Sequence, residues 1–269
     1  MSYYEDLCKK VCEIVEKVGE FALKNWDIEF DYEIKSPHNY VTKIDKECEN
    51  MLIENLSKIL PTANFLAEET LSNSYIEGLT WIIDPLDGTT NYIHKLPPVA
   101  ISVALYENNN PLIGVIYEIS RKEIFFTWEN SYSYLNNKKI SVSKTEEIDK
   151  SLIITGFPIF DDNRIEEVLA ALKYFFKNSS GVRRLGSAAT DLAYVSCGRA
   201  DAFYELNLNP WDVAAGALLV KNAGGKVSDF NGKKNFLFGK EIVSSNPFIY
   251  KELLEILQKI FKKKVYYDL

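Results

Sequence analysis

Histidine and cysteine are scarce in this sequence, which has two histidines and four cysteines among its 269 residues. The cysteines form no Cys-x-x-Cys pair, and only His38 and His94 could join them, so we do not expect a zinc site with sulfur and nitrogen ligands. Cys8 and Cys12 lie one helical turn apart, which is typical of small core residues. We therefore expect a reduced, cytosolic protein.

Long apolar runs are also missing. Charges begin at Glu5, and no stretch has the pattern of a signal peptide or a membrane span. Asp and Glu number 38 against 31 Lys and Arg, which gives a formal net charge of −7. An acidic balance repels nucleic-acid phosphates and anionic membranes, but it attracts divalent cations. We therefore expect neither a nucleic-acid partner nor a membrane partner.

The hydrophobic pattern divides the chain into two halves. Residues 1–142 combine amphipathic helices with short β-rich runs, which is an α+β pattern. Residues 143–269 alternate strands and helices, which is an α/β pattern. No linker rich in proline or serine separates them, so we expect the halves to pack closely. The expected helices span 3–25, 43–60, 163–177, 188–196, 211–222 and 247–262; the expected strands span 81–83, 99–105, 112–117, 123–126, 152–154, 201–205, 226–228 and 242–244; and the expected hairpin turns span 108–111 and 136–137.

Residues 81–91 carry the strongest chemical signature. The apolar run 81–83 predicts a buried strand that delivers Asp84 to its end. Gly88 permits an unusual backbone angle, so that Asp84 and Asp87 can converge on one point. The N–H groups that follow Gly88 are suited to hold an anion. A plain turn explains an isolated Asp-Gly pair, but the whole string favours a site in which metal separates the carboxylates from the anion.

Three other acidic residues occur in segments that fit the same chemistry. Glu68 follows an apolar stretch, Asp212 lies at the start of an apolar helix, and Asp45 follows Thr42 at the start of another helix. Each also has a purely structural explanation: a solvated loop for Glu68, N-capping for Asp212, and a capping box for Asp45. From these patterns alone, both interpretations stay open.

Taken together, these segments resemble the inositol monophosphatase family. That family lies within a superfamily of lithium-sensitive, magnesium-dependent phosphatases that includes fructose-1,6-bisphosphatase. The match spans nearly the whole chain, and its motifs are more specific for the superfamily than for the substrate. The matching segments are Val41-Thr42-x-x-Asp45, Glu68-Glu69-Thr70, 81–91, 155–158, 184–189, Tyr204-Glu205, 211–216 and 223–225. The resemblance implies a layered αβαβα sandwich of the sugar phosphatase type, with an antiparallel sheet in the N-terminal half and a mixed sheet in the C-terminal half.

The resemblance also implies two or three Mg²⁺ ions in each active site. Glu68, Asp84 and the backbone carbonyl of Leu86 would bind the first ion, and Asp84, Asp87 and Asp212 would bind the second. A third, weaker ion would lie near Glu68. Mg²⁺ prefers oxygen ligands, and two such ions would neutralise the four carboxylates.

Further roles follow from the same resemblance. The backbone N–H groups of Gly88 and Thr89 would hold the phosphate. Asp45 and Thr89 would help to activate the attacking water, with Glu68 also at the catalytic centre. The residues expected to contact the substrate are Asp87, Ala188 and Glu205.

The expected activity is the hydrolysis of a small phosphate monoester by a metal-activated water. Myo-inositol monophosphate is the leading substrate, and fructose 1,6-bisphosphate is the main alternative. A second hypothesis is a protein-binding role, because some bacterial relatives act as partners of the transcription machinery in ribosomal RNA synthesis. Family members are often homodimers, so we expect a homodimer.

Overall fold

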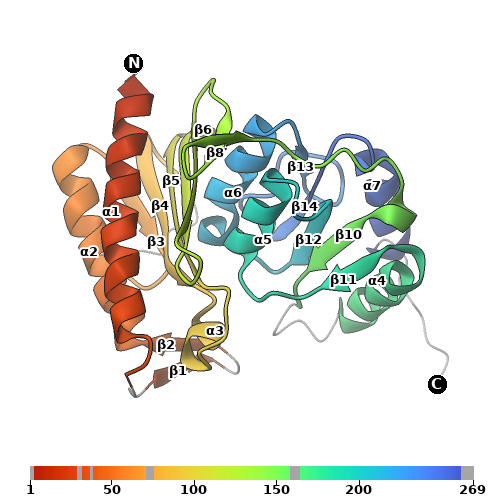
Figure 1. Ribbon diagram of the computed structural model, residues 1–269, viewed down its shortest axis with the longest axis horizontal. Helices are drawn as coiled ribbons and strands as arrows, with labels where there is room; N and C mark the ends of the chain where they lie inside the picture. Colours follow the sequence, from red (N-terminus) through yellow and green to blue (C-terminus); the bar gives the residue numbers. More distant parts are fainter. Residues whose placement is uncertain (1–2, 29–31, 37–38, 71–75, 158–163, 262–269) are drawn as a thin grey trace.

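The computed structural model describes residues 3–28, 32–36, 39–70, 76–157 and 164–261, and its helices and sheets form five layers (Figure 1). Two long helices cover one sheet, two helices lie in the centre, and two more cover the far side of a second sheet. The predicted αβαβα sandwich is therefore confirmed. The helices are α1 (Tyr3–Asn25), α2 (Lys43–Ile59), α3 (Thr89–Ile93), α4 (Ile165–Asn178), α5 (Ala188–Ser196), α6 (Pro210–Asn222) and α7 (Tyr250–Phe261).

The first sheet has seven strands in the order β3-β4-β5-β6-β7-β8-β9. Its neighbours pair antiparallel, as predicted, except that β3 pairs parallel with β4. The strands are β3 (Asn64–Ala67), β4 (Leu79–Asp87), β5 (Ala100–Glu107), β6 (Asn110–Glu118), β7 (Glu123–Trp128), β8 (Ser133–Leu135) and β9 (Lys138–Ile140).

The second sheet has five strands in the order β11-β10-β12-β14-β13. Strand β10 is parallel to both of its neighbours, whereas β14 is antiparallel to both of its own, so this sheet is mixed, as predicted. The strands are β10 (Leu152–Thr155), β11 (Gly181–Arg183), β12 (Ala202–Leu206), β13 (Lys226–Ser228) and β14 (Glu241–Ser245).

Three hydrophobic clusters hold the layers together. The first lies between the first sheet and the helices α1 and α2, which bury Val15 and Leu52 completely. The second surrounds α5 and α6 between the sheets, and the third packs α4 and α7 against the second sheet. Residues 213–220 of helix α6 are apolar and buried on all sides, and both sheets contact this helix. Each fully buried Leu or Val contributes roughly 1.5–3 kcal/mol through the hydrophobic effect.

The predicted elements agree with the structure, apart from their ends. Helix α7 begins at Tyr250 rather than 247, because the Asn246 side chain accepts hydrogen bonds from Phe248 N–H and Ile249 N–H in the turn before it. Both predicted hairpins are present, between β5 and β6 and between β8 and β9. The elements outside the predicted ranges are β1 (Tyr32–Ser36), β2 (Asn39–Thr42), β3, α3, β11 and the three-residue helix η1 (Ile148–Lys150).

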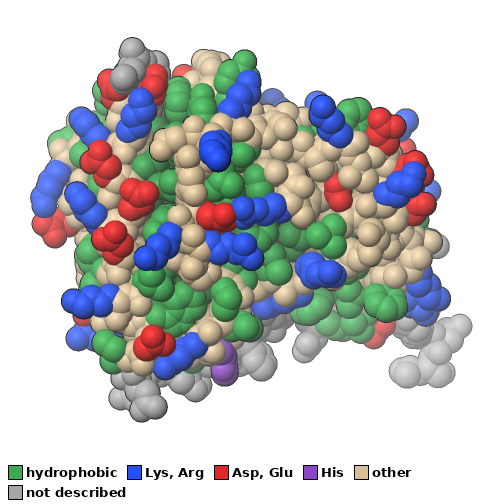
Figure 2. All heavy atoms as spheres, in the orientation of Figure 1, with side chains coloured by type: hydrophobic (Ala, Val, Ile, Leu, Met, Phe, Trp, Pro, Cys, Tyr) green, Lys and Arg blue, Asp and Glu red, His purple; other side chains and the backbone are tan. Residues whose placement is uncertain are grey.

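Several predictions fall at the edges of what the structure describes. His38, Pro158, residue 163 and residues 262–264 lie outside the described residues. The last strand of the first sheet ends at Ile140, and the first strand of the second sheet begins at Leu152. The division of the chain into two halves at residue 142 stays a prediction. In the ranges given above, the helices are all too short or too polar to cross a membrane. On the face seen in Figure 2, acidic and basic side chains are interspersed over α1.

Candidate active site

The loop from β4 to α3 brings two of the predicted carboxylates to the edge between the layers. The register of β4 against β5 shifts between Asp84 and Asp87, and Leu86 N–H donates a hydrogen bond to Asp84 Oδ1 at 3.0 Å. Gly88 then adopts a φ of 97° and caps α3. A Cβ at this position would lie 3.1 Å from Pro98 O, so glycine fits this loop both by its backbone angle and by its size.

Asp45 performs two tasks at the start of α2. One carboxylate oxygen accepts hydrogen bonds from the backbone and hydroxyl groups of Thr42, which completes a capping box. The other, Oδ1, lies 2.7 Å from Thr89 Oγ1. Thr89 Oγ1 is also 3.1 Å from Leu86 O, but a hydroxyl has one proton and donates it to one acceptor at a time. The capping interpretation and the catalytic pair are therefore compatible.

Helix α5 holds Asp87 in place. Asp87 Oδ2 accepts hydrogen bonds from Ser187 Oγ and from Ala189 N–H, both at 2.7 Å. Ser187 is the N-cap of α5, and Ala188 is its first residue. Burial raises the pKa of Asp87 to about 6, although these hydrogen bonds act in the opposite direction. The N-terminus of α5 thus lies directly beside the carboxylate at the end of β4.

Asp212 and Glu68 complete the acidic group. Asp212 is the third residue of α6, and its Oδ2 accepts a hydrogen bond from Asn209 N–H at 2.6 Å, so it also caps its helix. Glu68 follows β3, and its N–H donates to Ile83 O at 3.3 Å. Ile83 immediately precedes Asp84, so this bond fixes the backbone of Glu68 beside β4.

The four carboxylates act on one another electrostatically. Burial raises the pKa of Asp84 well above its ordinary value, and the charges of Glu68, Asp87 and Asp212 raise it further. Burial likewise raises the pKa of Asp212, with Asp87 as the strongest repelling charge. Side chains from three separate parts of the sequence are therefore close enough to repel one another, and this repulsion favours binding a cation.

The chemistry of these donors fits Mg²⁺. Asp84 and Asp212 each use one carboxylate oxygen in the hydrogen bonds found within the described ranges, so the other oxygen is available to a cation. Among the residues described, no three carboxylate, thiol or imidazole side chains enclose an ion by themselves. Mg²⁺ is bound by one or two carboxylates and keeps several waters, so a more open arrangement of oxygen donors suits it.

Glu205 lies on β12, which is a strand of the second sheet. Its carboxylate packs against Gly156, where an added Cβ would lie 1.9 Å from Glu205 Oε1. Burial raises the pKa of Glu205 to about 8, with repulsion from Asp87 adding to the effect and Arg184 opposing it. Glu205 thus belongs to the same electrostatic neighbourhood as the metal-site carboxylates.

Sequence reasoning did not assign roles to several residues that build this site. Ser187 binds Asp87, and Asn91 Nδ2 donates to Pro98 O at 2.9 Å and Leu185 O at 2.8 Å, tying α3 to the segment before α5. Asp191 on α5 is buried, and its Oδ1 has no hydrogen-bond partner in the described part of the chain. Ser187 and Asn91 lie within motifs that the sequence already marked, whereas Asp191 carries no local signal of burial.

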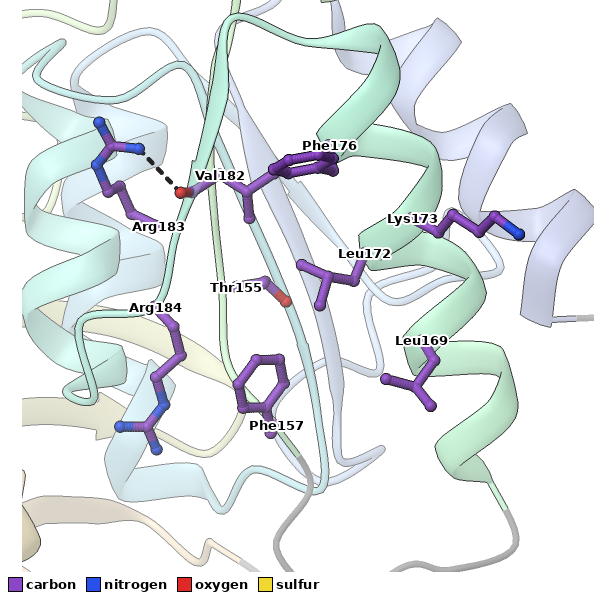
Figure 3. A pocket seen from close by; sticks show the side chains of 9 residues that line it. All are labelled: Thr155, Phe157, Leu169, Leu172, Lys173, Phe176, Val182, Arg183 and Arg184. Carbon is purple, nitrogen blue, oxygen red and sulfur yellow. Dashed lines mark hydrogen bonds between the residues drawn. The ribbon is translucent and has the colours of Figure 1, made fainter.

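A groove of about 400 Å³ lies near this site, between α4 and the ends of β10 and β11 (Figure 3). Leu169, Leu172 and Phe176 of α4 form one wall, and Phe157 follows β10 on the other side. Arg184, which acts on Glu205 and Asp87, lies at its edge. The four carboxylates are not among its lining residues, so the groove is distinct from the acidic site.

Known proteins with similar sequences and structures point to one family. A model of the inositol monophosphatase family matches residues 4–264. Over 244 residues the chain is 36% identical to the Nus factor SuhB of Escherichia coli strain K12, covering 88% of this chain and 90% of that protein. Over 230 residues it is 38% identical to the inositol-1-monophosphatase of Mesorhizobium japonicum, covering 84% and 85%.

The similarity extends to the whole fold. The solved structure of the Thermotoga maritima IMPase superimposes with a TM-score of 0.88 at 32% identity, covering 96% of this chain and 98% of that one. Family model, sequence relatives and structural neighbour all cover more than four fifths of the chain. The chain therefore belongs to the inositol monophosphatase family.

Proposed function

We propose that this protein is a Mg²⁺-dependent phosphatase that hydrolyses a small phosphate monoester, with myo-inositol monophosphate as its leading substrate. The observation that carries the proposal is that negative charges gather around two buried carboxylates. Glu68, Asp87 and Asp212 raise the pKa of Asp84, and Asp87 and Glu68 raise the pKa of Asp212. The named inositol-1-monophosphatase among its relatives supports the same chemistry.

Two groups of oxygen atoms would hold the metal. Glu68, Asp84 and the carbonyl of Leu86 would bind one Mg²⁺, and Asp84, Asp87 and Asp212 a second, with a third near Glu68. When bound, Mg²⁺ would supply positive charge to balance the phosphate. It would also lower the pKa of a water molecule, so that the water can lose a proton near neutral pH. The hydrogen bonds from Ser187 and Ala189 to Asp87 would hold that carboxylate in a fixed orientation for this role.

The chain's own groups would then orient the reactants. With its proton donated to Asp45, the Thr89 hydroxyl can accept a hydrogen bond from a water molecule and orient it. The first N–H groups of a helix have no acceptor within that helix, so those of Gly88 and Thr89 are suited to bind the phosphate oxygens. Because these donors are fixed by the backbone, they would stabilise developing negative charge without reorganisation.

Residues of the C-terminal half would bind the alcohol part of the substrate. Glu205, which Asp87 and Arg184 affect electrostatically, is suited to bind sugar or polyol hydroxyl groups, and Ala188 lies against Asp87. Fructose 1,6-bisphosphate would need room and positive charge for a second phosphate, and Arg184, which acts on Glu205 and Asp87, could provide that charge. This substrate remains the alternative within the same chemistry.

Phosphate release tests the proposal directly. Inositol 1-phosphate and fructose 1,6-bisphosphate should be incubated with the protein, with and without Mg²⁺, and free phosphate measured. We expect release from inositol 1-phosphate that EDTA abolishes and that Asp87→Asn lowers strongly. No turnover of either substrate under any divalent cation would overturn the enzyme proposal.

A second candidate function is a protein-binding role in transcription. It is favoured by the 36% identity to a protein named Nus factor SuhB, which extends over 90% of that protein. Asp87→Asn separates the two functions because it removes one charge at the acidic site. A variant that loses phosphatase activity but still replaces SuhB in a bacterium lacking it would favour the binding role.

We also propose that the protein is a homodimer. Phe176 on α4 is 78% exposed and Leu169 is 48% exposed, and both line the groove of Figure 3. Exposed apolar side chains gathered in one place are typical of surfaces that another protein covers. Sedimentation should give twice the chain mass, and Phe176→Asp should shift it toward one chain mass; a wild-type monomer would contradict the proposal.

A further inference from the structure

Glu49 is a completely buried carboxylate on α2, one helical turn after Asp45. It lies in no motif that the sequence analysis marked. Its Oε2 accepts a hydrogen bond from Glu69 N–H at 2.8 Å, and its Oε1 accepts one from the Thr70 hydroxyl. Both partners follow Glu68 directly in the sequence.

Hydrogen bonds hold both the backbone of Glu68 and the residue after it. Glu68 N–H donates to Ile83 O at 3.3 Å, which ties it to β4 just before Asp84. The next N–H, that of Glu69, is tied to α2 through Glu49. The strand ladder of β3 ends at Ala67, so Glu49 takes over where the sheet no longer supplies acceptors.

The same face of α2 also supports the other side of the site. Residues four apart on a helix lie on one face, about 5–6 Å apart at Cβ. Asp45 binds Thr89, and Glu49 binds the segment after Glu68. One rigid turn of α2 therefore sets the spacing between the Glu68 segment and the segment that carries Thr89.

We propose that Glu49 is a positioning residue that holds Glu68 where it can bind metal. The inference rests on the proposed function, because it assigns Glu68 to the metal. Residues that orient metal ligands typically change metal affinity about 10–100-fold when they are replaced. Removing the two acceptors of Glu49 should therefore weaken Mg²⁺ binding by about that factor.

A purely structural role for Glu49 predicts a different result, and Glu118 provides the matched control. Glu118 is also completely buried and accepts hydrogen bonds from the N–H and hydroxyl groups of Ser120 and from Arg121 N–H. These partners lie in the turn after β6, away from the predicted metal ligands in sequence. Glu118→Ala should lower the melting temperature without changing the affinity for Mg²⁺.

Calorimetric titration with Mg²⁺ tests the inference without depending on turnover. Wild type, Glu49→Ala and Glu118→Ala are titrated, and the Mg²⁺ concentration for half-maximal phosphate release is measured alongside. We expect the dissociation constant of Glu49→Ala to rise about 10–100-fold, and that of Glu118→Ala to match wild type. Equal affinities in wild type and Glu49→Ala would overturn the proposal.

Two milder variants cover the case in which Glu49→Ala does not fold. Glu49→Gln keeps one acceptor, and Thr70→Val removes one donor at an exposed residue. Both should fold and show a smaller rise in the Mg²⁺ dissociation constant; wild-type affinity in both would overturn the proposal. If wild type binds Mg²⁺ but releases no phosphate, the proposed function fails while the role of Glu49 in metal binding is still decided.

Discussion

Thr89 Oγ1 lies 2.7 Å from Asp45 Oδ1, although the two residues are 44 positions apart in the sequence. This hydrogen bond joins the start of α2 to the start of α3, and it orients the Thr89 hydroxyl group next to Gly88. A carboxylate that accepts this proton leaves the threonine oxygen free to accept a hydrogen bond from water. The pair can therefore orient a nucleophile without itself bonding to phosphorus.

Replacing Thr89 with valine removes the hydroxyl while preserving the shape of the side chain. We expect Thr89→Val to lower kcat about 10²–10⁴-fold, the range for groups that assist proton transfer, with little change in KM. Thr90→Val, at the exposed neighbouring position, is the matched control and should keep wild-type kcat. Steady-state kinetics on inositol 1-phosphate measure both. A Thr89→Val enzyme with full activity would remove the pair from the mechanism.

Burial and three neighbouring negative charges raise the pKa of Asp84, so its replacement should have opposite effects on stability and activity. Asp84→Asn keeps the oxygen that accepts from Leu86 N–H but removes the repelled charge. At pH about 8, without metal, we expect the free energy of unfolding to rise, because burial and the neighbouring negative charges disfavour a charged group at this position. Phosphatase activity should fall about 10³-fold or more.

Urea unfolding with and without Mg²⁺ checks this prediction. Mg²⁺ should stabilise wild type, because a ligand that binds the folded state shifts the equilibrium toward it, and should stabilise Asp84→Asn far less. If Mg²⁺ stabilised both proteins equally, Asp84 would not be a metal ligand.

The sequence predicted the layered fold well because the signals for it are local. Helices α1 and α2 show apolar residues at helical spacing, and β5 to β7 show apolar runs bounded by turns. The short strands β1, β2, β3 and β11 were missed because three to five residues carry too little pattern to distinguish a strand from a loop. Strands β3 and β11 also pair with strands that are distant in the sequence, whereas β1 pairs with the adjacent β2.

The candidate site was predictable to the extent that its residues occupy recognisable motifs. Asp45 and Asp212 each carried a capping interpretation as well, and the structure makes these hydrogen bonds in both cases. The interpretations were not exclusive, because a carboxylate has two oxygens and a cap uses one. Glu49 was missed because charged residues on a helix are mostly exposed, and its acceptor role depends on Glu69, 20 residues away.

Glu205 should make the stability of the metal-free protein fall as the pH rises. Burial raises the pKa of Glu205 from 4.5 to about 8. Between these two values the folded protein retains a proton that the unfolded chain has lost, so unfolding releases a proton and higher pH favours it. The raised pKa values of Asp84 and Asp212 act in the same direction.

Unfolding in EDTA between pH about 5 and about 8 measures this effect. We expect the free energy of unfolding to decrease across the range, and Glu205→Gln to make the decrease smaller because the amide does not titrate. Saturating Mg²⁺ should reduce the decrease as well, since a cation favours the deprotonated carboxylates. An identical slope in wild type and Glu205→Gln would show that Glu205 titrates normally in the folded protein.

Gly88 and Gly224 form a matched pair that separates backbone strain from crowding. Their φ angles are 97° and 92°, but a Cβ on Gly224 would meet no atom within 4 Å. Gly224→Ala should therefore cost only the strain of a left-handed backbone, about 1–2 kcal/mol of unfolding free energy. At Gly88 the same strain is joined by contacts at 3.1 Å with Pro98 O and 3.2 Å with Gly186 O.

We expect Gly88→Ala to destabilise the protein more than Gly224→Ala and, unlike it, to lower kcat. The extra cost arises because backbone carbonyl oxygens, unlike the ends of flexible side chains, move only with the chain that carries them. Relief of the contacts would displace the loop that holds Asp87 and Thr89, so the substitution acts on the metal ligands and on the phosphate donors together. Denaturant unfolding and kinetics of both variants measure the difference, and equal losses of stability with unchanged kcat would mean that the β4–α3 loop accommodates a methyl group without moving the site.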